Sequence, residues 1–196
     1  MVSTSHFLST PSSPRKVAHT RTIQLEAYER DDGLMDLEAL LEDSKPDSFT
    51  TLTRDFPCGV PIHLIAIRLT VNKAMDIVGA EAQMPRTPLP QTCPDAALNI
   101  ERLIGANLLQ GFRKEVSKRL PASLRCSHVS EMAALLPTLA IQSMMKEQAA
   151  KELNGAAGDT RPLKIGGCHA WREDGPVVLK YYPQWYVKPN AEAGQP

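Results

Sequence analysis

The residues His63-Leu64-Ile65-Ala66-Ile67-Arg68-Leu69-Thr70-Val71 carry the clearest β-strand signal of this chain. Side chains two positions apart on a strand point to the same face. One face therefore carries His63 followed by four apolar residues, Ile65, Ile67, Leu69 and Val71. Arg68 and Thr70 point to the opposite face. We predict a half-buried strand that starts with a histidine directed at a covering layer of helices.

The segments on either side of this strand predict an antiparallel sheet. Residues 23–28 and 35–42 alternate between apolar and polar side chains, and the turn signal Asp31-Asp32-Gly33 separates them. This pattern predicts a hairpin. A looser stretch with three prolines leads from the hairpin to the strand described above. Beyond that strand, Asn72-Lys73 turns the chain into a fourth strand, from about residue 75 to residue 84.

The character of the sequence then changes to helical. Residues 85–94 contain four prolines and cannot continue the sheet. Apolar spacing, with glycine or proline as stop signals, predicts helices at residues 96–104 and 108–120 and a longer one from 127 towards 153. Pro137 lies inside the longer helix and should kink or interrupt it.

The last part of the chain predicts a second β-hairpin. Residues 165–170 and 177–182 flank Asp174-Gly175, which is a hairpin turn signal. Strands first, helices next and a final hairpin describe an α+β fold. We expect an antiparallel sheet of about four strands covered by helices, plus this C-terminal β-hairpin.

Length and charge limit the domain organisation and the partners. The 196 residues, 42% of them hydrophobic, suffice for one sizeable core. We place it in a single domain at residues 19–186, with a disordered tail rich in Ser, Thr and Pro at 1–18 and a flexible tail at 187–196. Lys+Arg and Asp+Glu number 22 each, a balance that gives no positive field to attract nucleic acid.

The expected location is the cytoplasm. No apolar run approaches the ~20 residues that a membrane helix needs, and residues 1–16 lack the continuous apolar core of a secretion signal. The irregular spacing of the cysteines predicts free thiols or metal ligands, not a disulfide framework; they are Cys58, Cys93, Cys126 and Cys168. We expect no membrane partner, and homo-oligomerisation is left open.

Good metal ligands recur in three separated stretches: His63 begins the strand, Cys93 lies in the proline-rich loop, and Cys126 and His128 precede or begin the long helix. If strand and helix pack together, these four groups could converge on one zinc or iron ion. Glu131 shares the helix face of His128 and could act as a general base there. The alternative is structural: Cys126 is a small buried hydrophobe, His128 caps the helix, and Glu131 complements its dipole.

Arginines on or beside the sheet offer a site for an anion. Arg21 and Arg68, with Arg30 nearby, could hold a substrate carboxylate or phosphate in bidentate fashion. The alternative is that these guanidinium groups pair at the surface with acidic residues of the first hairpin, such as Glu38.

Four segments carry a family resemblance: Arg21-Thr22-Ile23, Tyr28-Glu29-Arg30-Asp31-Asp32-Gly33-Leu34, Ile67-Arg68-Leu69-Thr70-Val71 and Cys126-Ser127-His128-Val129-Ser130-Glu131. On these segments the chain resembles, from residue 21 to about residue 144, a bacterial family catalogued as domain of unknown function 2889. The resemblance implies no particular activity.

A more distant resemblance is to the iron–sulfur cluster scaffold family, of the NifU and IscU type. It rests on the strand at Ile67, a loop cysteine, a short helix ending in glycine, and a cysteine that opens a helix. The resemblance implies that His63 replaces the scaffold's ligand aspartate, and that Cys93 and Cys126 match its second and third cysteines. The scaffold's first cysteine falls at Pro61. With fewer thiolates and more imidazole, a single zinc or iron ion is favoured over a cluster.

These observations predict a metal-binding protein, with a small metal-dependent lyase or hydrolase as the main hypothesis. Its substrate would be a small organic or aromatic acid whose anionic group Arg21 or Arg68 orients. Two alternatives remain. One is an iron–sulfur cluster or sulfur carrier that uses Cys126. The other is a structural adaptor in which an ion only staples helices to the sheet.

Overall fold

The computed structural model describes residues 7–154 and 160–189, which fall into two compact units, Met1–Ala140 and Ile141–Pro196. A single domain over residues 19–186 stays a prediction. Residues 7–18 are exposed and contain no helix or strand. The remaining parts of the two predicted tails, residues 1–6 and 190–196, lie outside the described residues.

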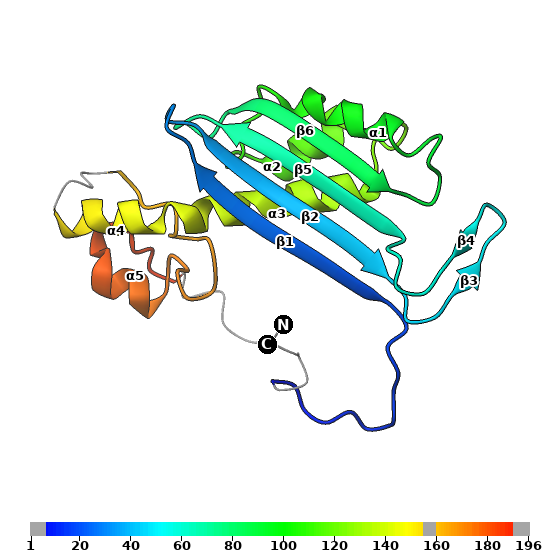
Figure 1. Cartoon of the computed structure of the whole chain (residues 1–196). Coiled ribbons are helices and arrows are strands. Elements are labelled where there is room, and N and C mark those ends of the chain that lie inside the picture. The colour runs from blue at the N-terminus through cyan, green and yellow to red at the C-terminus, as the bar shows by residue number, and fades with distance from the viewer. Residues whose placement is uncertain (1–6, 155–159, 190–196) are drawn as a thin grey trace. The chain divides into compact units, whose positions relative to one another are not determined.

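The first unit is built on a four-stranded antiparallel sheet in the order β1-β2-β5-β6 (Figure 1). Its strands are β1 (Thr20–Glu29), β2 (Met35–Ser44), β5 (His63–Val71) and β6 (Ile77–Arg86). The predicted hairpin at Asp31-Asp32-Gly33 is confirmed, and Gly33 adopts the positive φ (80°) that this turn requires. The sheet and the helices beside it confirm the α+β fold class.

One face of the sheet is buried and the other is open. Leu37, Leu41, Ile65 and Leu69 are fully buried, and they occupy alternate positions because successive side chains point to opposite faces. Helices α1, α2 and α3 all lie on one side of the sheet (Figure 1). The alternation predicted for His63–Val71 therefore positions its apolar face against the helical layer.

The helical layer follows the predicted order with different bounds. The helix predicted at 96–104 is α1 (Asp95–Leu98), which continues as the 3-10 helix η2 (Asn99–Leu103). The helix predicted at 108–120 is shorter, α2 (Phe112–Arg119), because Gly111 before it has a left-handed φ of 64°. The 3-10 helix η2 buries Ile100 and Leu103, and α2 buries Phe112 and Val116.

The long helix predicted from residue 127 towards 153 is two helices. The first, α3 (Ser127–Ser143), continues through Pro137, and the second, α4 (Met145–Leu153), follows after Met144. The interruption therefore comes two turns after the proline and not at it. Met132 and Leu136 are fully buried, and their spacing holds one face of α3 in the core.

The loop between β2 and β5 contains a small ribbon that was not predicted. Strands β3 (Phe49–Thr50) and β4 (Asp55–Phe56) pair antiparallel, with the rings of Phe49 and Phe56 stacked at 4.7 Å. Arg54, beside β4, donates a hydrogen bond to the carbonyl of Thr87 at 3.1 Å. That bond ties the ribbon to the loop that follows β6.

The predicted C-terminal β-hairpin is wrong. Residues 165–170 form turns, and the segment after Asp174-Gly175 is helical: α5 (Pro176–Tyr181) and the 3-10 helix η3 (Pro183–Trp185). Pro176 stands at the first helical position, where its fixed φ suits a helix and its missing N–H costs no hydrogen bond. Within the described residues, no helix is both long enough and apolar enough to cross a membrane.

Candidate metal centre

Three neighbouring strands each place one polar side chain in a row at the same end of the sheet. Arg21 of β1 lies opposite Asp43 of β2, and Asp43 lies opposite His63 of β5. All three occupy positions of the buried face. Asp43 follows Leu37, Ala39 and Leu41 at two-residue spacing, so the apolar alternation of β2 carries its carboxylate under the helical layer.

Asp43 is the centre of the site and is only 1% exposed. Arg21 donates to it twice, from Nε to Oδ1 at 2.7 Å and from Nη2 to Oδ2 at 2.8 Å, and His19 Nε2 lies 3.0 Å from Oδ1. Burial alone would raise the pKa of Asp43, but hydrogen bonds from Arg21 and His19 outweigh it and hold the pKa well below its usual range. The carboxylate is therefore ionised at neutral pH.

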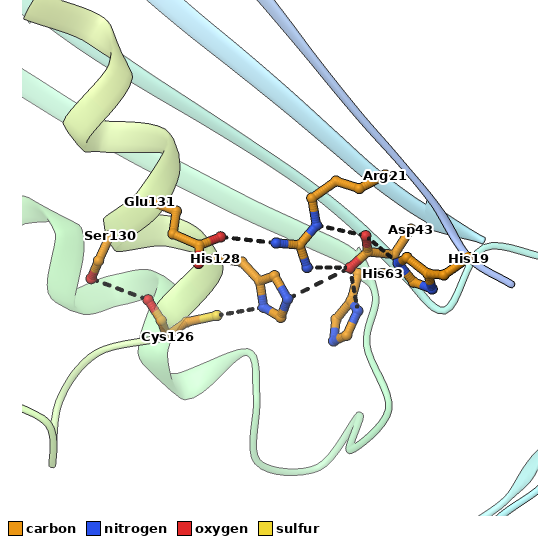
Figure 2. Close-up of polar contacts among 8 residues, drawn as sticks. All are labelled: His19, Arg21, Asp43, His63, Cys126, His128, Ser130 and Glu131. Carbon is orange, nitrogen blue, oxygen red and sulfur yellow. Dashed lines mark hydrogen bonds and ion pairs between the residues drawn. The ribbon is translucent and has the colours of Figure 1, made fainter. Parts of the chain in front are cut away.

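Two histidines meet at the same carboxylate oxygen (Figure 2). His63 Nδ1 lies 3.1 Å and His128 Nε2 lies 3.6 Å from Asp43 Oδ2, and the two imidazole rings are 4.1 Å apart. Burial lowers the pKa of both histidines, with the neighbouring charge of His128 acting further on His63 and that of Arg21 on His128. Neutral imidazole, the form that binds metals, is thus favoured.

The start of α3 brings the second group of residues to the sheet. Val129, Met132 and Ala133 are buried, which turns His128 and Glu131 towards β1 and β2. Glu131 Oε2 accepts a hydrogen bond from Arg21 Nη1 at 2.9 Å, as Figure 2 shows.

The cysteine before α3 contacts the far side of one of these imidazoles. Cys126 Sγ lies 3.6 Å from His128 Nδ1. Its backbone carbonyl accepts a hydrogen bond from Ser130 Oγ at 3.2 Å, which fixes the cysteine to the first turn of the helix. Cys126, His128 and Asp43 thereby form a continuous chain of contacts.

The three groups Asp43, His63 and His128 could hold a single metal ion. Their ligand atoms all lie within 4.8 Å of one another. A tetrahedral ion with bonds of about 2.0–2.2 Å places its donors roughly 3.3–3.6 Å apart, close to the 3.1 and 3.6 Å measured from Asp43 Oδ2. Two neutral imidazoles and one carboxylate suit zinc or non-haem iron. An ion would share Oδ2 with Arg21.

A cavity of about 630 Å³ opens beside the two histidines. Its polar lining includes His63, His128, Cys93 and Cys126. The cavity lies within the first unit, between β5, the loop after β6 and the segment before α3. Its size is in the range of small-molecule sites, about 300–1,000 Å³.

The structure brings most of the predicted site residues together. His63, His128, Arg21 and Glu131 meet around Asp43, and Cys126 contacts His128. Cys93 lines the cavity but is not among the three groups whose ligand atoms converge. The roles of Cys93 and Cys126 as metal ligands stay predictions.

Arg68 lies on the opposite, open face of the sheet. It donates to Glu38 at 2.7 Å and to Glu81 at 3.4 Å, which is the surface pairing that the sequence offered as the alternative. Since Arg21 faces the buried side, the two arginines cannot orient the same substrate.

Asp43 and His19 are the participants that the sequence analysis missed. The signal for Asp43 was a carboxylate on the apolar face of β2, two residues after Leu41. Its position predicts a buried charge that needs a partner. His19 lies immediately before β1, and its Nε2 is 3.0 Å from Asp43 Oδ1.

The chain matches a known protein family. A family model described as a protein of unknown function (DUF2889) matches residues 19–142, a range that contains every residue of the site. No curated protein and no solved structure matches the chain. The likeness to iron–sulfur scaffolds stays a prediction.

Proposed function

The chain belongs to the DUF2889 family of proteins of unknown function, and we propose that it binds one zinc or iron ion through Asp43, His63 and His128. The observation that carries the proposal is the convergence of three ligand atoms of the appropriate types within 4.8 Å. Their ionisation supports it, because the pKa of Asp43 and those of both histidines are all lowered. The carboxylate is charged and the imidazoles are neutral, as metal ligation requires.

We further propose that the centre is catalytic. Catalytic zinc sites use three protein ligands and leave a position for water or substrate, whereas structural sites are closed by four. The cavity beside His63 and His128 gives a small molecule access to that position. The bound ion would polarise a substrate oxygen or activate water.

Glu131 is the acid/base candidate. Its side chain is 56% exposed and pairs with Arg21, which also holds Asp43. Arg21 therefore contacts both Asp43, whose carboxylate would bind the ion, and Glu131, whose carboxylate would transfer a proton. A hydrolase or lyase acting on a small organic or aromatic acid is the activity that this arrangement supports best.

Elemental analysis of untagged protein purified without oxygen tests the metal proposal. We expect about one zinc or iron per chain in the wild type, little in His63→Ala and His128→Ala, and the wild-type amount in His169→Ala. His169 is the matched control because it lies in the second unit, next to Arg172. Metal-free wild-type protein with a cooperative unfolding transition would refute the proposal.

A thiol-dependent function is the second candidate, and one observation favours it. Cys126 Sγ, His128 and Asp43 follow one another at 3.6 Å and 3.6 Å, the order of nucleophile, base and orienting carboxylate in thiol enzymes. The same contacts suit a sulfur carrier. Under this function, alkylation of Cys126 abolishes activity and a chelator does not; under metal catalysis, the chelator abolishes it.

A further inference from the structure

The cavity beside the proposed ion has an apolar body and few charges. Its walls include Ile65, Met84, Leu89 and Leu124. Among the described residues that line it, only Asp95 and Arg125 carry a full charge at neutral pH. A ligand that fills this space must therefore be largely apolar, with its charge at a defined end.

Arg125 is the cation of this cavity, and its guanidinium lacks a protein partner among the described residues. It is exposed and makes none of the ion pairs that engage Arg21 and Arg68. An unpaired guanidinium in a cavity wall is suited to bidentate binding of a carboxylate.

The backbone around Arg125 is held in place from two sides. The N–H of Leu124 and that of Arg125 donate to the carbonyl of Pro121 at 2.9 and 3.2 Å. Asn99, another residue of the cavity wall, donates from Nδ2 to the carbonyl of Leu124 at 2.9 Å. Arg125 immediately precedes Cys126, which contacts His128. The arginine is thus tied to the same segment as the proposed centre.

Resting on the proposed metal centre, we infer that the cavity takes a small monocarboxylic acid with an apolar or aromatic body, and that Arg125 binds its carboxylate. The body lies against Met84, Leu89 and Leu124, and the reacting end faces His63 and His128. Arg125 thereby takes the anion-binding role that the sequence analysis assigned to Arg21 or Arg68; Arg21 is paired with Asp43 and Glu131, and Arg68 faces the other side of the sheet.

Binding measurements with two matched probes test the assignment. Cinnamate and its neutral isostere cinnamamide share one apolar body, but the amide lacks the charge and has a donor in place of one acceptor oxygen. Calorimetry or ligand-observed NMR measures the binding of both without turnover. We expect cinnamate to bind in the millimolar range or tighter, cinnamamide about 10-fold or more weakly, and Arg125→Ala to lose about 10- to 100-fold in cinnamate affinity.

Two control variants make the result specific. Arg68→Ala removes an arginine of the opposite face and should bind cinnamate as the wild type does. Asp95→Asn removes the other cavity charge and should leave cinnamate affinity unchanged or improve it, since like charges repel. Equal loss in Asp95→Asn and Arg125→Ala would overturn the monocarboxylate in favour of a zwitterion.

Other outcomes also overturn the inference: no cinnamate binding to the wild type, equal binding of acid and amide, or full affinity in Arg125→Ala. The measurements are made on both metal-loaded and chelated protein. Wild-type protein that takes up no zinc or iron yet binds cinnamate through Arg125 contradicts the proposed centre alone. Metal-loaded protein with no preference for the acid contradicts this inference alone.

Discussion

The substitution Asp43→Asn tests the arrangement of charges on which the site is built. Asparagine keeps the volume of the side chain but removes its charge and replaces one acceptor oxygen with a donor. That donor would face Arg21 or His63, both of which now approach an acceptor. The variant therefore removes the buried carboxylate partner of Arg21, whose remaining ion pair is the exposed one with Glu131.

The magnitude follows from the burial of the two partners. Removing one member of a fully buried ion pair costs about 3–5 kcal/mol, and Asp43 is buried. The side chain of Arg21 is 34% exposed, so water screens part of the loss. We expect the free energy of unfolding at pH 7 to fall by about 2–4 kcal/mol.

Urea unfolding followed by far-UV circular dichroism measures this loss. Both tryptophans, Trp171 and Trp185, belong to the second unit, so their fluorescence does not report on the site. In a double-mutant cycle with Arg21→Ala, the two substitutions should be coupled by about 1.5–3 kcal/mol.

The pH dependence of Asp43→Asn gives a second signature. The folded-state pKa of Asp43 is lowered, so its contribution is fully present above the unfolded value of about 3.9 and declines as the pH falls below it. The difference between wild type and variant should shrink as the pH falls below about 4. A loss under about 0.5 kcal/mol at pH 7, without coupling to Arg21, would show that the pair is not formed.

Two further predictions concern the histidines and the acid/base candidate. Burial lowers the folded-state pKa of His63 and His128, so metal-free protein should lose stability as the pH falls below the unfolded value of about 6.5. In unfolding experiments from about pH 5 to 7.5, His63→Gln should reduce the slope of the unfolding free energy against pH. An unchanged slope contradicts the lowered pKa. Glu131→Gln should change the free energy of unfolding by only about 0–1 kcal/mol, since the pair of Glu131 with Arg21 is exposed. The same variant should abolish turnover of any substrate found. Full activity would remove Glu131 from the mechanism.

The sheet could be predicted from the sequence because its signals are local. The alternation at His63–Val71 and the Asp31-Asp32-Gly33 turn each specify one backbone geometry, and both are found. The same kind of signal failed at Asp174-Gly175. There Pro176 favours the first turn of a helix, and this local preference outweighs the hairpin turn.

The site could be predicted only in part because its centre depends on contacts distant in sequence. His63 and His128 were recognisable as ligand types at the ends of a strand and a helix. Asp43 resembles the many acidic residues of the first hairpin, and only its register between Arg21 and His63 distinguishes it. The direction of Cys93 could not be predicted, because a loop with several prolines has no repeating geometry.

X-ray absorption at the metal edge of the loaded protein distinguishes the proposed ligands from the cysteine set. Coordination by Asp43, His63 and His128 predicts a first shell of nitrogen and oxygen at about 2.0–2.2 Å, with the outer-shell scattering of two imidazoles and no sulfur. A sulfur shell at about 2.3 Å would place Cys93 or Cys126 on the ion and contradict the proposed centre.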